Sequence, residues 1–280
     1  MPVKLEHVLT RVHGLPALPT SAMRVIALTK QPDADIKDLE NIITQDPALA
    51  ASILRQANSA YYGYARRISS LAEAIVILGF QAIQGLALAS AVAPILKSDL
   101  PGYNIDQEGL WKHCMLTAMV AKRLCRRLRL PFGDVAFTAG LLHDIGKLII
   151  AVYLQQVGSY IMDKVEKAQV TYAEMEEKVI GFDHGTVGGF IVKHWNLPDD
   201  LVDAISNHHT PQRSPNHRQL TAITHIADSM ANILGVGGGV DSFLNPLQPE
   251  ALKLFDLKDS DLELLLAEVI DLISDPTLFG

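Results

Sequence analysis

Residues 142–147 of the chain read Leu142-His143-Asp144-Ile145-Gly146-Lys147. An imidazole and a carboxylate are adjacent at the predicted end of one helix, and a glycine soon after them releases the backbone. The lysine follows the aspartate by one helical turn, which places it within reach of the carboxylate. Alone, the His-Asp pair is common, and a packed histidine beside a capping aspartate would explain it.

Other imidazoles and carboxylates flank this pair on or beside predicted helices. They are His113, His184, the adjacent His208 and His209, and Asp228. With His143 and Asp144 they form a set of nitrogen and oxygen donors without cysteine, which suits one or two ions of iron, manganese, nickel or zinc. Asp144 is the natural candidate to bridge two ions.

Two interpretations of these residues stay open from the sequence. They are either metal ligands or a hydrogen-bonded polar network that fixes helix packing without a metal. His225 lies three residues before Asp228 on one helix face, where it could substitute as a ligand, but a lone helical histidine is more often a packing or surface residue. We expect it to be a packing or surface residue and not a ligand.

Apolar residues recur at three- and four-residue spacing along most of the chain, and alternating strand patterns are hard to find. This periodicity predicts an all-α fold. The expected helices are Thr20–Lys30, Ile36–Gln45, Pro47–Asn58, Ser70–Leu78, Phe80–Leu96, Gln107–Leu128, Gly133–Leu142, Lys147–Gln155, Gly158–Ala168, Tyr172–Ile180, His184–Trp195, Asp199–Asn207, Arg218–Leu234 and Asp261–Ile273. Asp35, Thr171 with Glu174, and Ser260 are expected to cap helix starts, and Gly235 to end a helix.

The polar stretch from Lys97 to Asn104 contains Pro-Gly and separates an alanine-rich block from the histidine-bearing part. We therefore expect two helical lobes, residues 1–104 and residues 105–280. The second lobe is expected to hold the candidate metal site and an acidic C-terminal helix.

Residues 75–96 carry no formal charge and are long enough to span a membrane. Because glycines and glutamines interrupt them, we expect two packed core helices and no span.

The overall charge of −7 does not indicate a general nucleic-acid-binding protein. One basic cluster exists, comprising Lys122, Arg123, Arg126, Arg127 and Arg129. We expect it to be the exposed end of a helix, where the helix dipole stabilises cations. Nucleic acid as a partner is the weaker alternative.

The two cysteines, Cys114 and Cys125, lie too far apart on one helix to pair, and the first residues lack an apolar run. These features indicate a reducing cytoplasm.

The order His, His-Asp, His, His-His and Asp on successive helices resembles the HD superfamily of metal-dependent phosphohydrolases. In these enzymes the metals generate hydroxide and hold phosphate oxygens, and a lysine stabilises the phosphoryl charge. The resemblance implies catalytic roles for Asp144 and Lys147, a nucleotide or phosphate ester as ligand, and the seven residues above as metal ligands.

The N-terminal part resembles the HDOD module, the HD-related output domain of bacterial signalling proteins. The matching phrases are Leu15-Pro16-Ala17-Leu18-Pro19, Gln45-Asp46-Pro47-Ala48-Leu49, Asn58-Ser59-Ala60-Tyr61-Tyr62, Ile68-Ser69-Ser70-Leu71 and Ala74-Ile75-Val76-Ile77-Leu78-Gly79. With the HD-like half, the resemblance covers about residues 15–234. It implies a two-lobed regulatory protein that acts through contacts with signalling proteins, and an active phosphohydrolase is the alternative.

Two departures bear on the activity expected. Gly109 stands one turn before His113, where relatives that hydrolyse cyclic dinucleotides place a glutamate for a further metal. His208-His209-Thr210-Pro211 is not followed by Gly-Tyr-Pro. Both departures argue against hydrolysis of cyclic-di-GMP.

Overall fold

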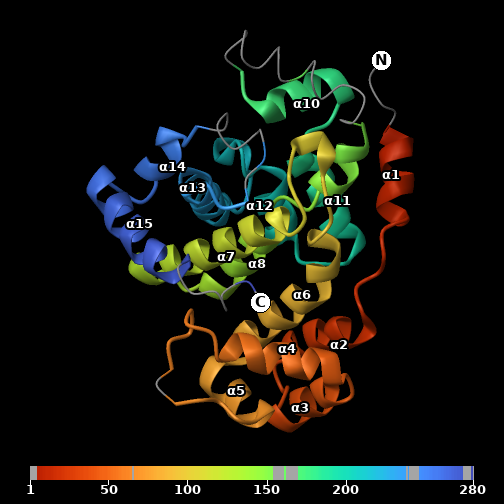
Figure 1. The fold of residues 1–280 in the computed structure, drawn as a ribbon, viewed down its shortest axis with the longest axis vertical. Coiled ribbons are helices and arrows are strands. Elements are labelled where there is room, and N and C mark those ends of the chain that lie inside the picture. Colours follow the sequence, from red (N-terminus) through yellow and green to blue (C-terminus); the bar gives the residue numbers. More distant parts are fainter. Residues whose placement is uncertain are drawn as a thin grey trace. The chain divides into compact units, whose positions relative to one another are not determined.

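The computed structural model describes residues 5–64, 66–153, 161, 170–237, 239, 246–273 and 279. Throughout these residues the regular structure is helical, and the one β-type pairing is an isolated antiparallel bridge between Leu100 and Ile105. Figure 1 shows the helices in chain order. The predicted all-α fold is confirmed.

The chain divides into two compact units. Unit 1 comprises Met1–Pro16 and Leu96–Leu266, and unit 2 comprises Ala17–Ile95 and Ala267–Gly280. The division after Ile95 comes just before the polar stretch in which the sequence places the boundary. The units differ from the predicted lobes 1–104 and 105–280 in where they place the two ends of the chain.

Unit 2 is a small helical domain with its own core. Its helices are α2 (Thr20–Thr29), α3 (Ile36–Thr44), α4 (Pro47–Ala57), α5 (Leu71–Leu78) and all but the last residue of α6 (Phe80–Leu96). α3, α4 and α5 each begin at an N-cap residue. The side chains of Asp35, Asp46 and Ser70 accept a hydrogen bond from the backbone N–H three residues further along the chain. The core includes Leu39, Ile53 and other side chains withdrawn from water.

Residues 75–96 do not form one straight apolar helix. α5 ends at Gly79, whose φ of 81° favours glycine, and α6 leaves at an angle of 119°. The expectation of two helices in this stretch is confirmed. Among the described residues one helical stretch, Gly133–Tyr153, is long and apolar enough to cross a membrane, but 83% of its most apolar window is buried inside the fold. Such burial is typical of a core helix.

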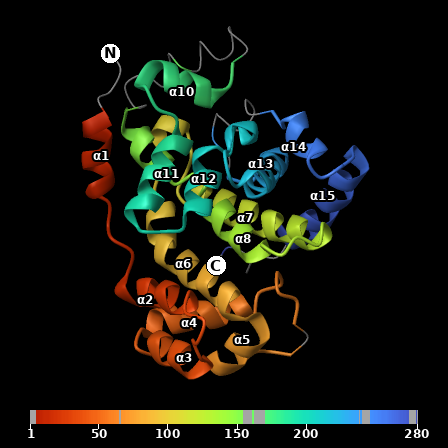
Figure 2. The same ribbon diagram turned by 180° about the vertical axis from the view of Figure 1, so that it is seen from behind.

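Unit 1 carries the histidine-bearing helices. They are α1 (Leu5–His13), η1 (Pro101–Tyr103), α7 (Gly109–Arg127), α8 (Gly133–Leu142), helical residues 147–153, α10 (Tyr172–Ile180), α11 (His184–His194), α12 (Asp199–Ser206), η2 (Pro211–Arg213), α13 (Arg218–Ile233), α14 (Pro249–Lys253) and the first part of α15 (Asp259–Ile273). α7 and α13 are buried along most of their length, and both pack against α8. Figure 2 shows α1 alongside α11, which it contacts.

Most predicted helices agree with the structure to within two residues at each end. α1 and α14 were not expected from the sequence, and most of the helix predicted at Gly158–Ala168 lies outside the described residues. The capping box of Thr171 and Glu174 is confirmed, and Gly235 follows α13 with a φ of 68°. The cap predicted at Ser260 is wrong, because α15 already begins at Asp259.

The basic cluster on α7 is partly engaged within unit 1. Lys122 Nζ lies 2.6 Å from Asp134 Oδ1, and Arg127 pairs with Asp261 at 3.7 Å. The acidic start of α15 therefore meets the basic end of α7.

Both cysteines are free and buried, and burial raises the pKa of the Cys125 thiol to about 12, which leaves it unreactive.

Candidate metal centre

The structure brings all seven candidate ligands together inside unit 1. His113 lies on α7, Asp228 on α13, and His184 is the first residue of α11, while the other four follow the ends of α8 and α12. Six of the seven are at most 2% exposed. His209 is the seventh and is only partly buried.

The first group contains two imidazoles and a carboxylate. The ligand atoms of His113, His143 and Asp228 all lie within 4.8 Å of one another. His113 Nε2 lies 3.1 Å from Asp228 Oδ1, and His143 Nε2 lies 3.5 Å from the same oxygen. These three atoms face a common point, as ligands of one ion would.

The second group consists of three imidazoles. His184, His208 and His209 also place their ligand atoms within 4.8 Å of one another. The Nε2 atoms of His184 and His209 are 2.7 Å apart. Two ring nitrogens this close share either a proton or a cation.

Asp144 lies between the two groups. Its Oδ2 is 3.3 Å from His143 Nε2 and 3.5 Å from His113 Nε2, while its Oδ1 is 3.2 Å from His184 Nε2. One carboxylate oxygen therefore faces each group, which is the arrangement of a bridging ligand. Lys147 Nζ lies 2.7 Å from Oδ2 of the same carboxylate.

Unpartnered nitrogens show that the residues fit a metal. His143 Nδ1–H donates to Gly140 O at 2.7 Å, and His208 Nδ1–H donates to Ile205 O at 2.8 Å. In the neutral ring Nε2 then carries a lone pair, and both Nε2 atoms are buried without a hydrogen bond. A buried acceptor without a partner costs about 1–3 kcal/mol, which coordination would offset.

Without a metal, bound protons on the histidines must balance the negative charges of the buried aspartates in this centre. Burial alone lowers the pKa of His143, but the negative charges of Asp144 and Asp228 close to its ring outweigh that effect and raise the pKa to about 9. Burial raises the pKa of Asp144 and Asp228, yet the neighbouring cationic groups hold both pKa values well below the usual range. The carboxylates are therefore ionised, as ligands must be.

The second group has one basic and two weakly basic histidines. Burial opposes protonation of His184, but Glu176 and Asp144 raise its pKa well above the usual value. Burial and the charges of His143 and His184 lower the pKa of His208 to about 3. Burial and the neighbouring His208 and His184 also lower the pKa of His209. The last two rings are neutral and have lone pairs for a cation.

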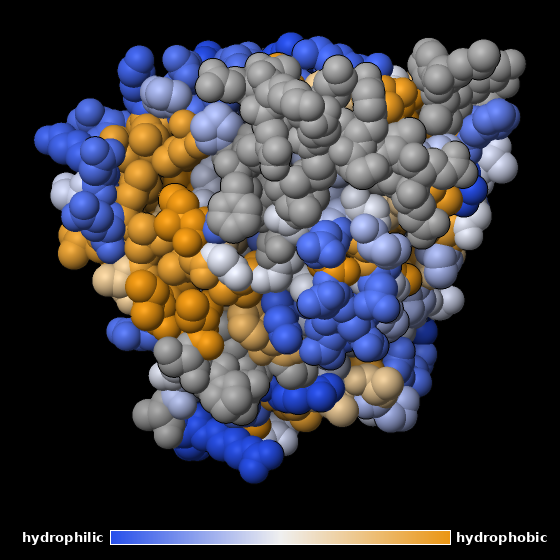
Figure 3. Space-filling view, turned by 45° about the horizontal axis from the view of Figure 1, so that its top comes forward, coloured by the Kyte–Doolittle hydropathy of each residue, from blue (hydrophilic) through white to orange (hydrophobic). Residues whose placement is uncertain are grey.

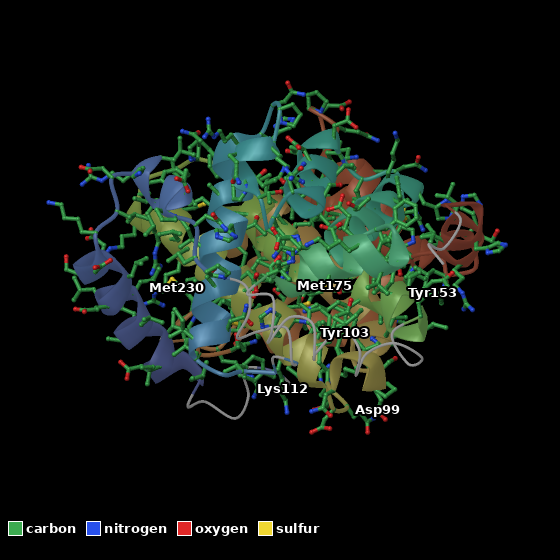
Figure 4. The ribbon with its side chains drawn as sticks, turned by 90° about the horizontal axis from the view of Figure 1, so that it is seen from above. Asp99, Tyr103, Lys112, Tyr153, Met175 and Met230 are labelled. Carbon is green, nitrogen blue, oxygen red and sulfur yellow. The ribbon has the colours of Figure 1, made fainter. Side chains whose placement is uncertain are left out.

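The sequence did not reveal the residues behind the ligands. Glu176 on α10 is fully buried, and its Oε2 accepts from both the backbone N–H and Nδ1–H of His184 at 2.8 Å. Tyr103 O–H donates to Glu176 Oε1, and the Tyr103 ring lies 5.3 Å from Lys147 Nζ. Figure 4 labels Tyr103 and Met175, on the side of unit 1 where η1 and α10 meet. One signal existed: Tyr172, Glu176 and Ile180 recur at four-residue spacing, so a charge lies on the apolar face.

His225 also supports a ligand, because it lies behind His208. Its Nδ1–H donates to His208 O at 2.8 Å, and its Nε2 accepts from the Gln248 backbone N–H at 2.9 Å. Both nitrogens are therefore occupied. His225 thus holds the backbone of His208.

Glycines allow the elements to approach closely at this site. A Cβ on Gly146 would lie 1.9 Å from His184 O, so only glycine lets the turn after Asp144 touch the start of α11. A Cβ on Gly109 would lie 2.7 Å from Ile105 Cγ2 and 3.4 Å from Gly237 O. A side chain at position 109 would therefore have to displace the side chain of Ile105.

Comparisons with known proteins agree with this fold. The sequence model of the HDOD domain family matches residues 15–211. An uncharacterised protein of Treponema pallidum (strain Nichols) is 23% identical over 210 residues, which are 73% of this chain and 39% of that protein. The chain thus spans about two fifths of the length of that relative.

Solved structures share the whole fold. An HDOD domain protein of unknown function from Geobacter sulfurreducens has a TM-score of 0.72 and 26% identity, over 97% of this chain and 96% of that one. A candidate phosphohydrolase from Shewanella amazonensis SB2B has a TM-score of 0.72 and 24% identity, covering 98% and 96%. A candidate signal transduction protein from Marinobacter aquaeolei VT8 has a TM-score of 0.74 and 23% identity, covering 100% and 62%. With the family match over most of its length, the chain belongs to the HDOD domain family.

Proposed function

We propose that this chain is a bacterial, cytoplasmic regulatory protein that binds one or two divalent metal ions in unit 1 and acts through contacts with signalling proteins. The first ion would be held by His113, His143 and Asp228. The second ion would be held by His184, His208 and His209. Asp144 would bind both ions. The mixed nitrogen and oxygen donors suit iron, manganese, nickel or zinc. The bound metal would supply positive charge that joins helices from distant parts of the chain.

The observation that carries this proposal is the burial of a complete ligand set. Six ligands are almost wholly withdrawn from water, and Lys147 is only 4% exposed beneath the Tyr103 ring. A centre closed in this way suits a structural or sensing role, because binding joins α7, α11 and α13 without requiring a substrate to reach the metal. Metal occupancy would then set the stability of unit 1.

Exposed apolar side chains offer a surface for partners. In unit 1 these include Ile233, Leu254 and Leu264, and in unit 2 Val76 and Ile77 lie exposed on α5. Figure 3 shows a broad apolar area with hydrophilic residues along its left edge. Exposed apolar groups of this kind are common at protein–protein contacts. Replacing Val76 with aspartate should weaken partner capture from bacterial extract while leaving metal content unchanged.

The decisive experiment compares two histidines on the same helix. Protein purified without a metal-affinity tag is analysed for metal per chain by elemental mass spectrometry, as wild type, His184→Ala and His194→Ala. We expect one or two equivalents in the wild type and in His194→Ala, whose exposed ring lies outside the centre, and a clear loss in His184→Ala. Equal metal content in all three, or none after loading with iron, manganese, nickel and zinc, would refute the metal centre.

An active metal-dependent phosphohydrolase is the second candidate. It is favoured by the position of Asp144 between the two groups and by the contact of Lys147 with its Oδ2. The metal would activate water and neutralise phosphate charge. In this case Lys147 would leave Asp144 to hold a phosphate oxygen, and Asp144 would orient the ions.

The enzyme is tested with metal-loaded protein on a panel of phosphomonoesters and nucleotides. Turnover that falls at least a hundredfold in Lys147→Ala, at unchanged metal content, would support it. No turnover across the panel, or equal turnover in Lys147→Ala, would eliminate it.

A further inference from the structure

A surface cleft of unit 1 ends at the second ligand group. His209 lies in its lining together with Glu174 and Glu177 of α10, Asp183 before α11, and Arg213 of η2. Since His209 is the one candidate ligand that is not almost fully buried, the cleft is where the described surface comes nearest to the centre.

The cleft carries more negative than positive charge. Three carboxylates face one guanidinium, which gives 1 − 3 = −2 for the lining. Glu174 and Asp183 accept hydrogen bonds from helix N-terminal amides, and Glu177 and Arg213 are exposed. A concave surface of this charge concentrates cations and repels phosphate.

Of the three imidazoles in the second ligand group, that of His209 has the fewest hydrogen bonds to hold it. The Nδ1 atoms of His184 and His208 are held by Glu176 and by Ile205 O, whereas Nδ1 of His209 has no hydrogen-bond partner. Its Nε2 still lies 2.7 Å from His184 Nε2 inside the centre. Turning of the His209 ring toward the cleft would therefore break its contact with His184 Nε2 but no hydrogen bond at Nδ1.

We propose that this cleft is the loading route for the divalent cation. Glu177 and Asp183 draw the hydrated ion in, His209 is the first ligand to bind it, and the ion then passes to His184 and His208. The route rests on the metal centre proposed above. It assigns the cleft to the cation and not to a phosphorylated substrate.

The test measures the rate of Co²⁺ uptake by the metal-free full-length protein in a stopped-flow instrument, from the absorption of the bound ion. The variants are Glu177→Lys, Arg213→Gln and, as a control, Glu263→Lys on the exposed face of α15. At low ionic strength Glu177→Lys should load about three to ten times more slowly than wild type and Arg213→Gln faster, with Glu263→Lys unchanged. These differences should shrink in about 0.5 M salt, because screening removes the attraction. The final Co²⁺ per chain should be the same in all four proteins.

The outcomes separate the route from the centre. If the wild type takes up no Co²⁺, both the centre and its route are wrong. If all four proteins bind the same amount at the same rate, the centre stands and the route is wrong. Slower loading by Arg213→Gln would also overturn the route, since it would show that the guanidinium helps the bound species to enter.

Discussion

At the residue scale, the centre depends on groups that hold the ligands as much as on the ligands. Each carboxylate oxygen of Glu176 is engaged, one by His184 and one by Tyr103. A carboxylate bonded to Nδ1–H fixes the tautomer in which Nε2 binds metal and makes the ring a stronger donor. Glu176 is therefore a positioning residue for the second group.

Replacing Glu176 with glutamine should lower metal affinity at the second group about 10- to 100-fold, because an amide holds the ring less firmly and carries no charge. Isothermal titration with Zn²⁺ measures the change. Glu263→Gln on α15 is the control, and its affinity should change less than threefold, since Glu263 is exposed and lies outside both the centre and the cleft lining. Equal affinities for the two variants would contradict the positioning role.

The histidine charges also predict how stability depends on pH in the metal-free protein. The pKa of His143 is raised from 6.5 to about 9, so its stabilising contribution is complete below pH 6.5 and is lost as the pH rises through about 9. The pKa of His208 is lowered from 6.5 to about 3, so its contribution is lost as the pH falls through that range. The free energy of unfolding should therefore be highest near pH 6.5.

Urea unfolding of the metal-free protein tests this dependence. Between pH 6.5 and 9 we expect a loss on the order of 3 kcal/mol, and His143→Gln should reduce the slope. Metal affinity should change in the opposite direction, because the ion must displace the proton of His143. A stability that rises steadily to pH 9 would show that His143 is not protonated in the folded chain.

At the element scale, the close approach of the turn after Asp144 and α11 sets the spacing between the two ligand groups. Gly146 meets His184 O, and Gly188 on α11 lies near the same turn. Since the nearest atoms belong to the backbone, a side chain at position 146 could be accommodated only by moving α11 and His184 with it.

Gly146→Ala should therefore destabilise the protein by about 3 kcal/mol and reduce the metal bound by the second group. Gly133→Ala is the matched control, because the nearest atoms lie 3.6 Å from its added Cβ. That change should alter stability by less than about 1 kcal/mol. Urea unfolding and metal content measure both effects, and two variants with the same behaviour would disprove the close-approach argument.

At the scale of the whole molecule, both units have apolar cores, but only unit 1 also buries the candidate ligands. The core of unit 2 contains none of them. In unit 1, where side chains such as Leu110 and Leu116 are fully buried, a cation in the proposed centre would balance the charges of the buried ionised groups. Metal should therefore stabilise the two units unequally.

Hydrogen exchange measured by mass spectrometry tests this inequality. Adding Zn²⁺ to the metal-free protein should slow exchange in α7, α11 and α13 by at least tenfold and leave α3 and α4 unchanged. The same comparison with His184→Ala should show little change anywhere. An equal gain of protection in α3 and α4 would show that the two units open together.

The sequence by itself determined the helices and the identity of the candidate ligands. Apolar spacing and caps such as Asp35 and Thr171 act within a few residues of the chain, so they can be recognised without knowing what packs where. The HDOD family and the order of its histidines and aspartates were likewise visible. The start of the last helix was predicted wrongly, because α15 already begins at Asp259, before the expected cap Ser260.

Only the tertiary structure decided how these residues are grouped. That Asp144 faces both sets of imidazoles, that Glu176 and Tyr103 support His184, and that Arg127 meets Asp261 all depend on contacts between residues far apart in the chain. The spacing of Glu176 from Tyr172 and Ile180 places a charge on an apolar helix face, but it does not reveal the partners of that charge. Those partners depend on the packing of α10 against the centre, where water is excluded and each polar group must find a partner.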